Sequence, residues 1–402
     1  MFLSDLFLPP PFDAADTLGP ILGGGALPPT RPATLAGHGL RRDPGGVRVA
    51  LAAAAGESVT GLLLTAAGDA RARLDFAMAA LGAVPVPVTV ATGAGPAPAE
   101  AYLFADTVPE GQGVPAGEDR ARLAEALVEV IGHYGRRTAA DMPFLLHGIG
   151  IRALGRARGP HRSLPVVLGA AHTAADVESL SRDFAYAHYF GVEEHRLRHR
   201  RFDGTMSEVI GRGVFTSGDA VTVLPYDPRR DAVLMIEQFR AGPFARRDPR
   251  PWSLEPPAGR ADRSEPPEET ARREAHEEAG LDIGRVERIA AFYPSPGIMS
   301  EYITAFVGEA DLGRAGGVYG LAEEHEDIRA IVVPLAEALA ACASGEIDTA
   351  PLLLSLFWLD RHGSGSGARG CDPPAARPGP GSPCRPASKP LSPGPRPPKR
   401  TR

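Results

Sequence analysis

The stretch "GRADRSEPPEETARREAHEEAGL", residues 259–281, decides the fold of the second half of the chain. Two prolines near its start, two glutamates directly after them and Gly280 near its end predict a helix over residues 267–279. The stretch carries seven carboxylates in 23 residues. Like charges on neighbouring helix positions repel each other by roughly 0.2–0.5 kcal/mol per pair. Such crowding therefore indicates that the helix holds a cation.

The predicted helix places three carboxylates on one face. Glu274 and Glu278 stand one turn apart, and Glu277 lies beside them. Hard oxygen ligands of this kind suit Mg²⁺, which binds through a few carboxylates together with substrate phosphates, and Mn²⁺ is a possible substitute. Arg273 is expected to pair with a glutamate and to orient it. The alternative interpretation is a solvated surface helix.

The spacing of these residues resembles the Nudix box. The matching positions are Gly259, Glu265, Arg273, Glu274, Ala275, Glu277, Glu278, Gly280 and Leu281. Ala275 is smaller than the usual aliphatic residue. The resemblance implies an α/β/α sandwich, a metal site made by Glu274, Glu277, Glu278 and the backbone carbonyl of Ala258, and a catalytic role for Arg273. Its chemistry is the attack of water on a diphosphate linked to another moiety.

Sequence beyond the box resembles the ADP-ribose pyrophosphatase branch, in particular its tellurite-resistance-associated group. The segments that carry this resemblance are "RHRRFDGTMSEVIGRGVF", "VLMIEQFRAGPF", "WSLEPPAG" and "YPSPG". A proline about sixteen residues past the box marks the branch, and Pro296 stands sixteen residues after Gly280. The resemblance assigns substrate binding to Ser295, Pro296, Gly297 and Arg240. Arg240 also fits the role of an ordinary charge at a strand end.

The acidic segment "GLAEEHEDIRA", residues 320–330, resembles the family loop that brings a glutamate over the bound diphosphate. A carboxylate at this place accepts the proton that the attacking water loses, while Mg²⁺ stabilises charge on the phosphoryl oxygens. The motif match ranks Glu324 first as the catalytic base and gives Glu326 as a further base or metal ligand. Spacing alone does not decide among Glu323, Glu324 and Glu326.

The N-terminal part resembles the gamma-glutamylcyclotransferase-like (AIG2-like) fold, a small α+β domain of β-barrel type. The segments "ATLAGHGLRRD", "GESVTGLLLTAAGDARARLDFAMAALG" and "VPVTVATGAG" follow the order of that family. The family's glycine-containing substrate loop is replaced by residues 4–7, and its acid/base glutamate corresponds to Met78. We therefore expect this domain to be catalytically inactive and to have a structural role, such as stabilising a dimer, with modulation of substrate access or binding of a small ligand as alternatives. Cyclotransferase activity would require an acid from elsewhere in the chain.

Composition shifts and the two family resemblances together predict four segments along the α/β chain. They are a cyclotransferase-like domain (1–157), a linker (158–175), a Nudix domain (176–362) and a disordered, basic, Pro-rich tail (363–402). The tail contains eleven prolines, and its eight Lys/Arg face a single Asp. It therefore lacks the apolar surface that folding requires. Residues 1–362 carry 35 Lys/Arg and 48 Asp/Glu, a net charge of −13.

This acidic body argues against nucleic-acid binding, which depends on Lys/Arg. Three cysteines without a CxxC pair, and an N-terminus with neither a signal peptide nor a membrane span, predict a cytoplasmic protein.

The family resemblance further implies a homodimer with exchanged N-terminal strands in residues 176–215. The expected reaction is hydrolysis of ADP-ribose to AMP and ribose 5-phosphate. GDP-mannose or a related nucleoside diphosphate sugar is the alternative substrate, and nucleotide sensing without catalysis is a further alternative.

Overall fold

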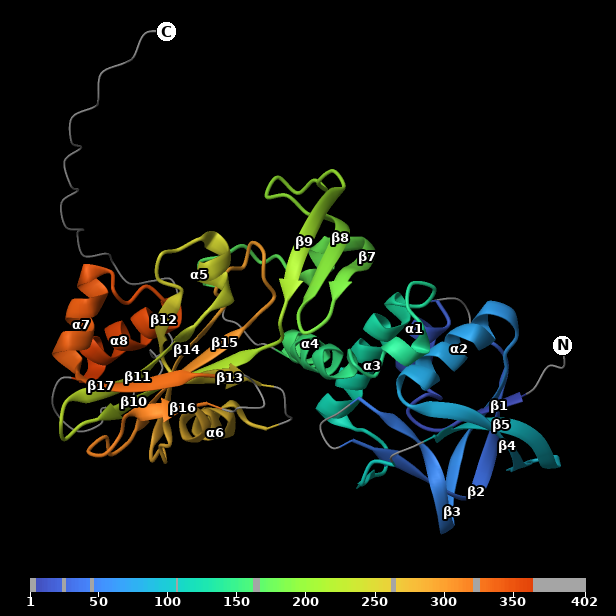
Figure 1. The fold of residues 1–402 in the computed structure, drawn as a ribbon. Helices are drawn as coiled ribbons and strands as arrows, with labels where there is room; N and C mark the ends of the chain where they lie inside the picture. The colour runs from blue at the N-terminus through green and yellow to red at the C-terminus, as the bar shows by residue number, and fades with distance from the viewer. Residues whose placement is uncertain are drawn as a thin grey trace, which may run out of the picture. The chain divides into compact units, whose positions relative to one another are not determined.

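The described residues form three β-sheets and the helices that pack on them (Figure 1). The computed structural model describes residues 5–23, 27–43, 47–105, 108–161, 167–261, 265–320 and 326–363. The tail predicted from residue 363 onward lies outside this part apart from its first residue, so its disorder stays a prediction. No helix in the described ranges is long and apolar enough to cross a membrane.

The first sheet forms a ring. Its strands are β1 (Asp5–Leu8), β2 (Thr30–Arg42), β3 (Val49–Thr65), β4 (Ala83–Thr92), β5 (Gly95–Phe104) and β6 (Gly111–Gln112). β1 pairs with β3 and β5, β3 pairs with β2, β2 pairs with β4, and β4 pairs with β5. These five strands close on themselves, which is an α+β arrangement of barrel type.

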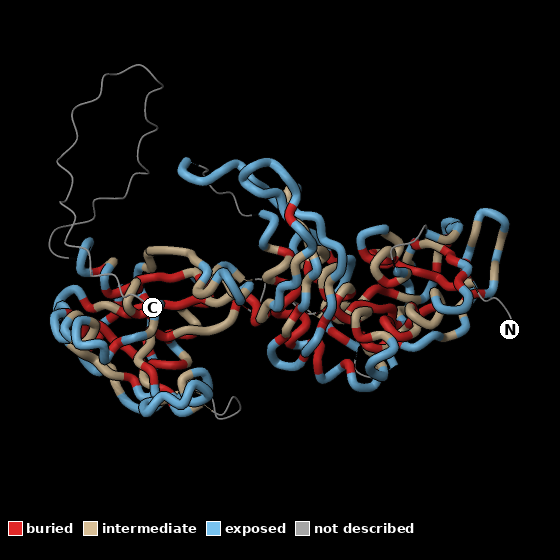
Figure 2. The backbone as a smooth tube through the Cα atoms, turned by 90° about the horizontal axis from the view of Figure 1, so that it is seen from above, coloured by how far each residue is buried: buried red, intermediate tan, exposed pale blue. Residues whose placement is uncertain are grey.

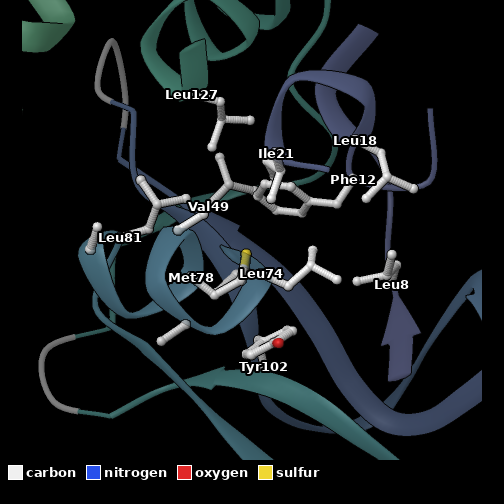
Figure 3. Close-up of a cluster of buried hydrophobic side chains, with 14 of the residues drawn as sticks. Leu8, Phe12, Leu18, Ile21, Val49, Leu74, Met78, Leu81, Tyr102 and Leu127 are labelled. Carbon is white, nitrogen blue, oxygen red and sulfur yellow. The ribbon is translucent and has the colours of Figure 1, made fainter. Parts of the chain in front are cut away.

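The helices beside this ring supply the rest of its core. They are α1 (Ala15–Ile21), α2 (Gly68–Ala80), α3 (Gly117–Gly132) and α4 (Leu146–Arg158). Leu74 and Met78 on α2 are at most 1% exposed. Figure 3 shows both side chains between Val49 and Tyr102, among other apolar groups. Met78 therefore lies in a dry apolar core, where it packs as an ordinary hydrophobic residue.

The expected position of the degenerate substrate loop is wrong. Residues 4–7 were expected to replace that loop, but Asp5–Leu8 form strand β1. The reason is the apolar sequence Leu-Phe-Leu, whose side chains are buried and whose backbone pairs antiparallel with β3. The turn comes later, where the N–H of Phe12 donates to the carbonyl of Pro9 at 2.9 Å. That turn begins with three prolines and, like residues 4–7, contains no glycine.

The second sheet has three antiparallel strands, namely β7 (Val177–Ala187), β8 (Gly191–His199) and β9 (Ile210–Thr216). A tight turn joins β7 to β8, in which the N–H of His188 donates to the carbonyl of Phe190 at 2.9 Å. β9 then leads directly into the third sheet. In sequence, this small sheet therefore lies between α4 and the third sheet, on which the carboxylate-rich helix 267–279 packs.

The third sheet has eight strands in the order β14-β15-β10-β11-β17-β16, with β12 beside β11 and β13 beside β10. The strands are β10 (Ala220–Asp227), β11 (Ala232–Phe239), β12 (Trp252–Glu255), β13 (Ala258–Arg260), β14 (Val286–Phe292), β15 (Ile303–Glu309), β16 (Gly317–Tyr319) and β17 (Ile328–Pro334). The helices of this region are α5 (Ala241–Arg246), α6 (Pro267–Ala279), α7 (Leu335–Ser344) and α8 (Ala350–Gly363). β10 and β11 form the hairpin that the turn "DPRRD" predicts.

Helices cover both faces of this sheet. Leu234 and Ile236 of β11 share one core with α6, whereas Val233 and Met235 share the other core with α7 and α8. This division follows from the strand period of two, which points successive side chains to opposite faces. The α/β/α layering expected for this part of the chain is therefore present. Figure 2 shows buried residues along the inner stretches of the chain, whereas exposed residues lie in the connections and also along much of strand β7.

Candidate active site

Helix α6 presents one apolar face and one acidic face. Ala271, Ala275 and Ala279, spaced four residues apart, are at most 1% exposed and pack against the sheet. Because alanine is small, the helix backbone lies close to the strands, and Ala275 fits this contact although it is smaller than the usual box residue. Gly280 ends the helix with a positive φ of 62°. The helix bounds predicted from the sequence agree with the structure.

The carboxylates of Glu274 and Glu278 are buried rather than solvated, with exposed fractions of 8% and 4%. The interpretation of α6 as a solvated surface helix is therefore wrong. Glu278 accepts a hydrogen bond from the N–H of Ala258 at 2.7 Å. Burial raises the pKa of Glu278 well above its usual value, and the charges of Glu274 and Glu326 raise it further. The negative charges of Glu274, Glu278 and Glu326 thus lie close enough to influence one another.

Gly259 makes room for one of these groups. A Cβ atom at this position would lie 1.9 Å from Oε1 of Glu274. The Glu274 carboxylate therefore lies directly against the backbone of β13, next to Ala258. This close approach explains physically why the first position of the box must be glycine.

Arg273 lies among the other carboxylates of the box. Its Nη1 donates to Glu274 at 2.7 Å and to Glu277 at 3.0 Å, and its Nη2 donates to Glu265 at 3.2 Å. Burial would lower the pKa of Arg273, but these neighbours raise it well above its usual value. The guanidinium therefore sets the directions of three carboxylates at once. Its catalytic role stays a prediction.

Arg240 stands directly after β11, within electrostatic reach of Glu278 and Glu326. Its Nε and Nη2 donate to the two oxygens of Glu255 at 2.8 and 2.7 Å, a bidentate ion pair. Burial would lower the pKa of Arg240, but Glu255, Glu278 and Glu326 raise it. Sequence reasoning missed Glu255, although it stands in the segment "WSLEPPAG". The register of β12 on β11, with Ile236 opposite Glu255, brings it to Arg240.

The acidic loop is described only in part. Glu323 and Glu324 lie outside the described residues, so the structure does not place the first-ranked base. Glu326 is described and partly buried, and its charge acts on both Glu278 and Arg240. Glu326 therefore lies within electrostatic reach of Glu278 and Arg240. The choice of base within this loop stays open.

The turn predicted to bind substrate follows β14. The carbonyl of Ser295 accepts hydrogen bonds from the N–H groups of Ile298 and Met299 at 3.1 and 2.9 Å, and Pro296 and Gly297 are exposed at its tip. Hydrogen bonds of Phe215 with the carbonyl of Ile298 and with the N–H of Ser300 tie this turn to β9. These hydrogen bonds hold the turn in shape, and substrate binding by Ser295, Pro296 and Gly297 stays a prediction.

Glu301, at the end of this turn, is a second residue that sequence reasoning missed. It accepts a hydrogen bond from the hydroxyl of Ser217 at 3.1 Å. Burial raises the pKa of Glu301, while Ser217, Arg260 and Arg240 oppose that rise. The end of the turn therefore lies within the electrostatic reach of Arg240. No sequence motif marked Glu301, because its significance comes from the fold.

The residues around α6 suit a hard divalent cation. Within the described ranges, no three His, Cys, Asp or Glu side chains already form a ready-made metal cluster, and Arg273 instead holds Glu274 and Glu277. Glu274 and Glu278 nevertheless repel each other while buried, which is unfavourable without positive charge. Carboxylate oxygens beside a backbone carbonyl are the ligands that Mg²⁺ and Mn²⁺ prefer. The donor set therefore fits either ion.

A cavity of about 690 Å³ lies elsewhere, between β11, β12, β17 and α7. Its lining includes Met235, Trp252, Arg329 and Glu337. Met235 belongs to the core on the α7 face of the sheet, whereas α6 packs on the opposite face. None of the carboxylates of α6 lines this cavity. We place the candidate site at α6 because the reactive groups converge there.

Comparisons with known proteins point to the same region. The NUDIX domain family model matches residues 216–354, a range that contains every candidate site residue named above. The ADP-ribose pyrophosphatase of Escherichia coli strain K12 is 42% identical over 200 residues, which cover 50% of this chain and 93% of that protein. The ADP-ribose pyrophosphatase of Haemophilus influenzae is 37% identical over 188 residues, or 46% of this chain and 86% of that protein. The GDP-mannose pyrophosphatase of Citrobacter koseri is 36% identical over 149 residues, or 37% of this chain and 76% of that protein.

Proposed function

The chain belongs to the Nudix hydrolase family, and on this premise we propose that it hydrolyses the diphosphate of ADP-ribose to AMP and ribose 5-phosphate. The observation that carries this proposal is the group of buried carboxylates on α6 beside β13. Glu274 and Glu278 lie against Gly259 and Ala258. The named ADP-ribose pyrophosphatases support the choice of substrate.

We assign the metal site to Glu274, Glu277, Glu278 and the carbonyl of Ala258. When bound there, Mg²⁺ supplies Lewis-acid stabilisation of the negative charge on the diphosphate oxygens. Arg273 orients the carboxylates and offsets their mutual repulsion through its hydrogen bonds to Glu274 and Glu277.

In the reaction, water forms a bond to one phosphorus atom while the bond from that phosphorus to the bridging oxygen breaks. Glu324 accepts the proton that the attacking water loses, with Glu326 as the other candidate. The bridging oxygen leaves with the second phosphate, so the products carry one phosphate each. The partly buried Glu326, whose charge acts on Glu278, supports the choice of Glu326 as a candidate.

Arg240 binds the nucleotide end of the substrate. Glu255 engages Nε and Nη2 of its guanidinium and thereby fixes its plane. Nη1 takes no part in the two hydrogen bonds to Glu255, and the charges of Glu278 and Glu326 act on the same guanidinium. A preoriented guanidinium loses little freedom when it binds an anion.

GDP-mannose is the second candidate substrate, because the Citrobacter koseri GDP-mannose pyrophosphatase is 36% identical over its matched part. The likeness of "VLMIEQFRAGPF" and "WSLEPPAG" to the tellurite-resistance-associated group favours ADP-ribose. The family resemblance also leads us to propose a homodimer, and the cysteine pattern leads us to propose a cytoplasmic location.

For the N-terminal part, we propose a degenerate cyclotransferase-like domain over residues 1–157, a linker over 158–175 and a Nudix domain over 176–362. The ring of five strands supports the barrel type of the first domain. Met78 supports its inactivity, because its thioether cannot transfer protons and is only 1% exposed. The role of this domain is structural.

Product analysis tests the hydrolase proposal. Wild-type protein is incubated with Mg²⁺ and with ADP-ribose, GDP-mannose or ADP-glucose, and the phosphate-containing products are separated. AMP from ADP-ribose as the preferred reaction supports the proposal, and preference for GDP-mannose keeps the site but changes the substrate. Binding of ADP-ribose without cleavage of any of the three overturns it in favour of nucleotide sensing. Glu324→Gln tests the base, and a rate equal to wild type rejects that assignment.

A further inference from the structure

Arg260 connects the candidate metal site to the rest of the molecule. It is the last residue of β13, directly after Gly259 and two residues after Ala258. β13 pairs with β10, with Ala220 opposite Arg260. We infer that the N-terminal domain positions β13 through Arg152, the β7–β8 turn and Arg260, and so maintains the metal site. This inference rests on the proposed function of that site.

The first link joins β13 to the β7–β8 turn. The guanidinium carbon of Arg260 lies 4.1 Å from the ring centroid of Tyr189 and 4.9 Å from that of Phe190. The two rings lie 4.9 Å apart in an edge arrangement, and Phe190 also packs on Phe215 of β9. Cations are attracted to aromatic faces at these distances. Two neighbouring rings of the turn therefore lie against the Arg260 guanidinium.

The second link joins this turn to α4 of the N-terminal domain. Nη1 of Arg152 donates to the backbone carbonyls of His188 and Tyr189, each at 3.2 Å. The same guanidinium pairs with Glu129 of α3 at 2.5 Å, and both side chains are at most 1% exposed. Arg152 thus fixes the backbone of the residue whose ring covers Arg260.

Neighbouring ion pairs make this arrangement rigid. Arg156 of α4 donates to Glu129 at 2.9 Å and to Glu193 of β8 at 3.1 Å. Arg182 of β7 also donates to Glu193, at 2.7 and 2.9 Å. Buried charges that are paired and hydrogen-bonded hold one geometry, because each alternative leaves a charge without a partner.

The consequence at the metal site follows from the short distance along β13. The N–H of Ala258 binds Glu278, and the backbone of Gly259 touches the carboxylate of Glu274. A displacement of Arg260 shifts both residues, because the strand backbone is continuous. Groups that orient metal ligands from outside typically change metal affinity by about 10–100-fold when they are removed.

The experiment measures Mn²⁺ binding to the full chain by the electron paramagnetic resonance signal of free Mn²⁺, which does not depend on turnover. The test variants are Arg260→Met, the double variant Tyr189→Leu/Phe190→Leu and the double variant Arg152→Met/Glu129→Met, which removes both buried charges together. Arg260→Lys retains the cation. Tyr186→Leu is the matched control, because Tyr186 in β7 is also an aromatic residue, 55% exposed, and its ring stacks on His188 instead of Arg260.

We expect the Mn²⁺ dissociation constant to rise about tenfold in the three test variants. Tyr186→Leu stays at the wild-type value, and Arg260→Lys recovers most of the affinity. KM for ADP-ribose, measured at saturating Mg²⁺, changes by less than about twofold, because the effect acts through the metal. A merely structural role would lower the melting temperature without this selective loss of metal affinity.

Unchanged Mn²⁺ binding in the Tyr189→Leu/Phe190→Leu variant overturns the inference. This variant decides the matter if Arg260→Met or the buried double variant does not fold, because both rings are partly exposed. If Arg152→Met/Glu129→Met folds and binds Mn²⁺ like wild type, the N-terminal domain has no part in the positioning. A wild-type protein that binds Mn²⁺ but cleaves no nucleotide sugar refutes the proposed function alone, and the binding data still test the inference.

Discussion

Replacing Gly259 by alanine tests the close packing of the carboxylate helix against β13. The added Cβ would lie 1.9 Å from Oε1 of Glu274, whereas ordinary van der Waals contact begins near 3.4 Å. The Glu274 carboxylate must therefore move away from β13 by about 1.5 Å. A displacement of this size in an active site typically lowers the reaction rate by about 100-fold. This loss corresponds to about 2.7 kcal/mol of transition-state stabilisation. We expect the variant to remain folded. The substitution can break the hydrogen bond from Arg273 to Glu274, and such a bond contributes only about 1.5–3 kcal/mol to the free energy of unfolding.

The assay is steady-state hydrolysis of ADP-ribose with Mg²⁺, with the melting temperature measured in parallel. Gly213→Ala is the matched control, because Gly213 is also in a strand and a Cβ there meets no atom within 4 Å. We expect kcat/KM to fall about 100-fold for Gly259→Ala and to stay unchanged for Gly213→Ala. Full activity of Gly259→Ala would refute the reasoning, because it would show that the position of Glu274 against β13 is not needed.

Three further changes test other parts of the structure. Glu255→Gln breaks the bidentate pair with Arg240, so KM for ADP-ribose should rise about tenfold with kcat nearly unchanged, and an unchanged KM contradicts the role of the pair. Met78→Glu puts an unpaired carboxylate into an apolar core, so urea unfolding should show a loss of about 3 kcal/mol or more, and equal stability would mean that water reaches this site. Asp227→Asn should lower stability by about 2 kcal/mol at pH 7, as measured by urea unfolding. Burial would raise the pKa of Asp227, but Arg230 and three backbone N–H groups lower it to about 2. The ionised carboxylate therefore stabilises the fold fully above about pH 4, and this stabilisation is lost as the pH falls towards 2. The free energies of unfolding of wild type and Asp227→Asn should become similar at pH 2. A difference that persists unchanged at pH 2 contradicts this explanation.

The sequence predicted the elements whose signals are local. Helix α6 follows from its prolines and Gly280, and the β10–β11 hairpin follows from two apolar runs around "DPRRD". The apolar patterns of "PLAEALAACASG", which ends at Gly345, and of "APLLLSLFWLDRH" likewise indicate the last two helices, α7 and α8. Each of these signals lies within about fifteen residues of the element that it specifies, so no knowledge of the tertiary structure is needed.

Other parts of the site depend on contacts between segments far apart in sequence. Glu255 meets Arg240 only because β12 pairs with β11 in one register, and a shift by one residue would point Glu255 to the opposite face. Arg260 meets Tyr189 only because two sheets come together. The placement of the substrate loop at residues 4–7 failed for a similar reason, since the pairing of β1 with β3 defines that strand. Periodicity along one segment carries none of this information.

The most direct test of the central claim is the rate of AMP formation from ADP-ribose by wild type and Glu278→Gln. Each is measured with Mg²⁺ and after treatment with a chelator. We expect wild type to form AMP only with Mg²⁺, and Glu278→Gln to be slower by at least about 100-fold while it remains folded. AMP formation that persists in the chelated wild type, or at the wild-type rate in Glu278→Gln, would contradict a metal-dependent hydrolase centred on helix α6.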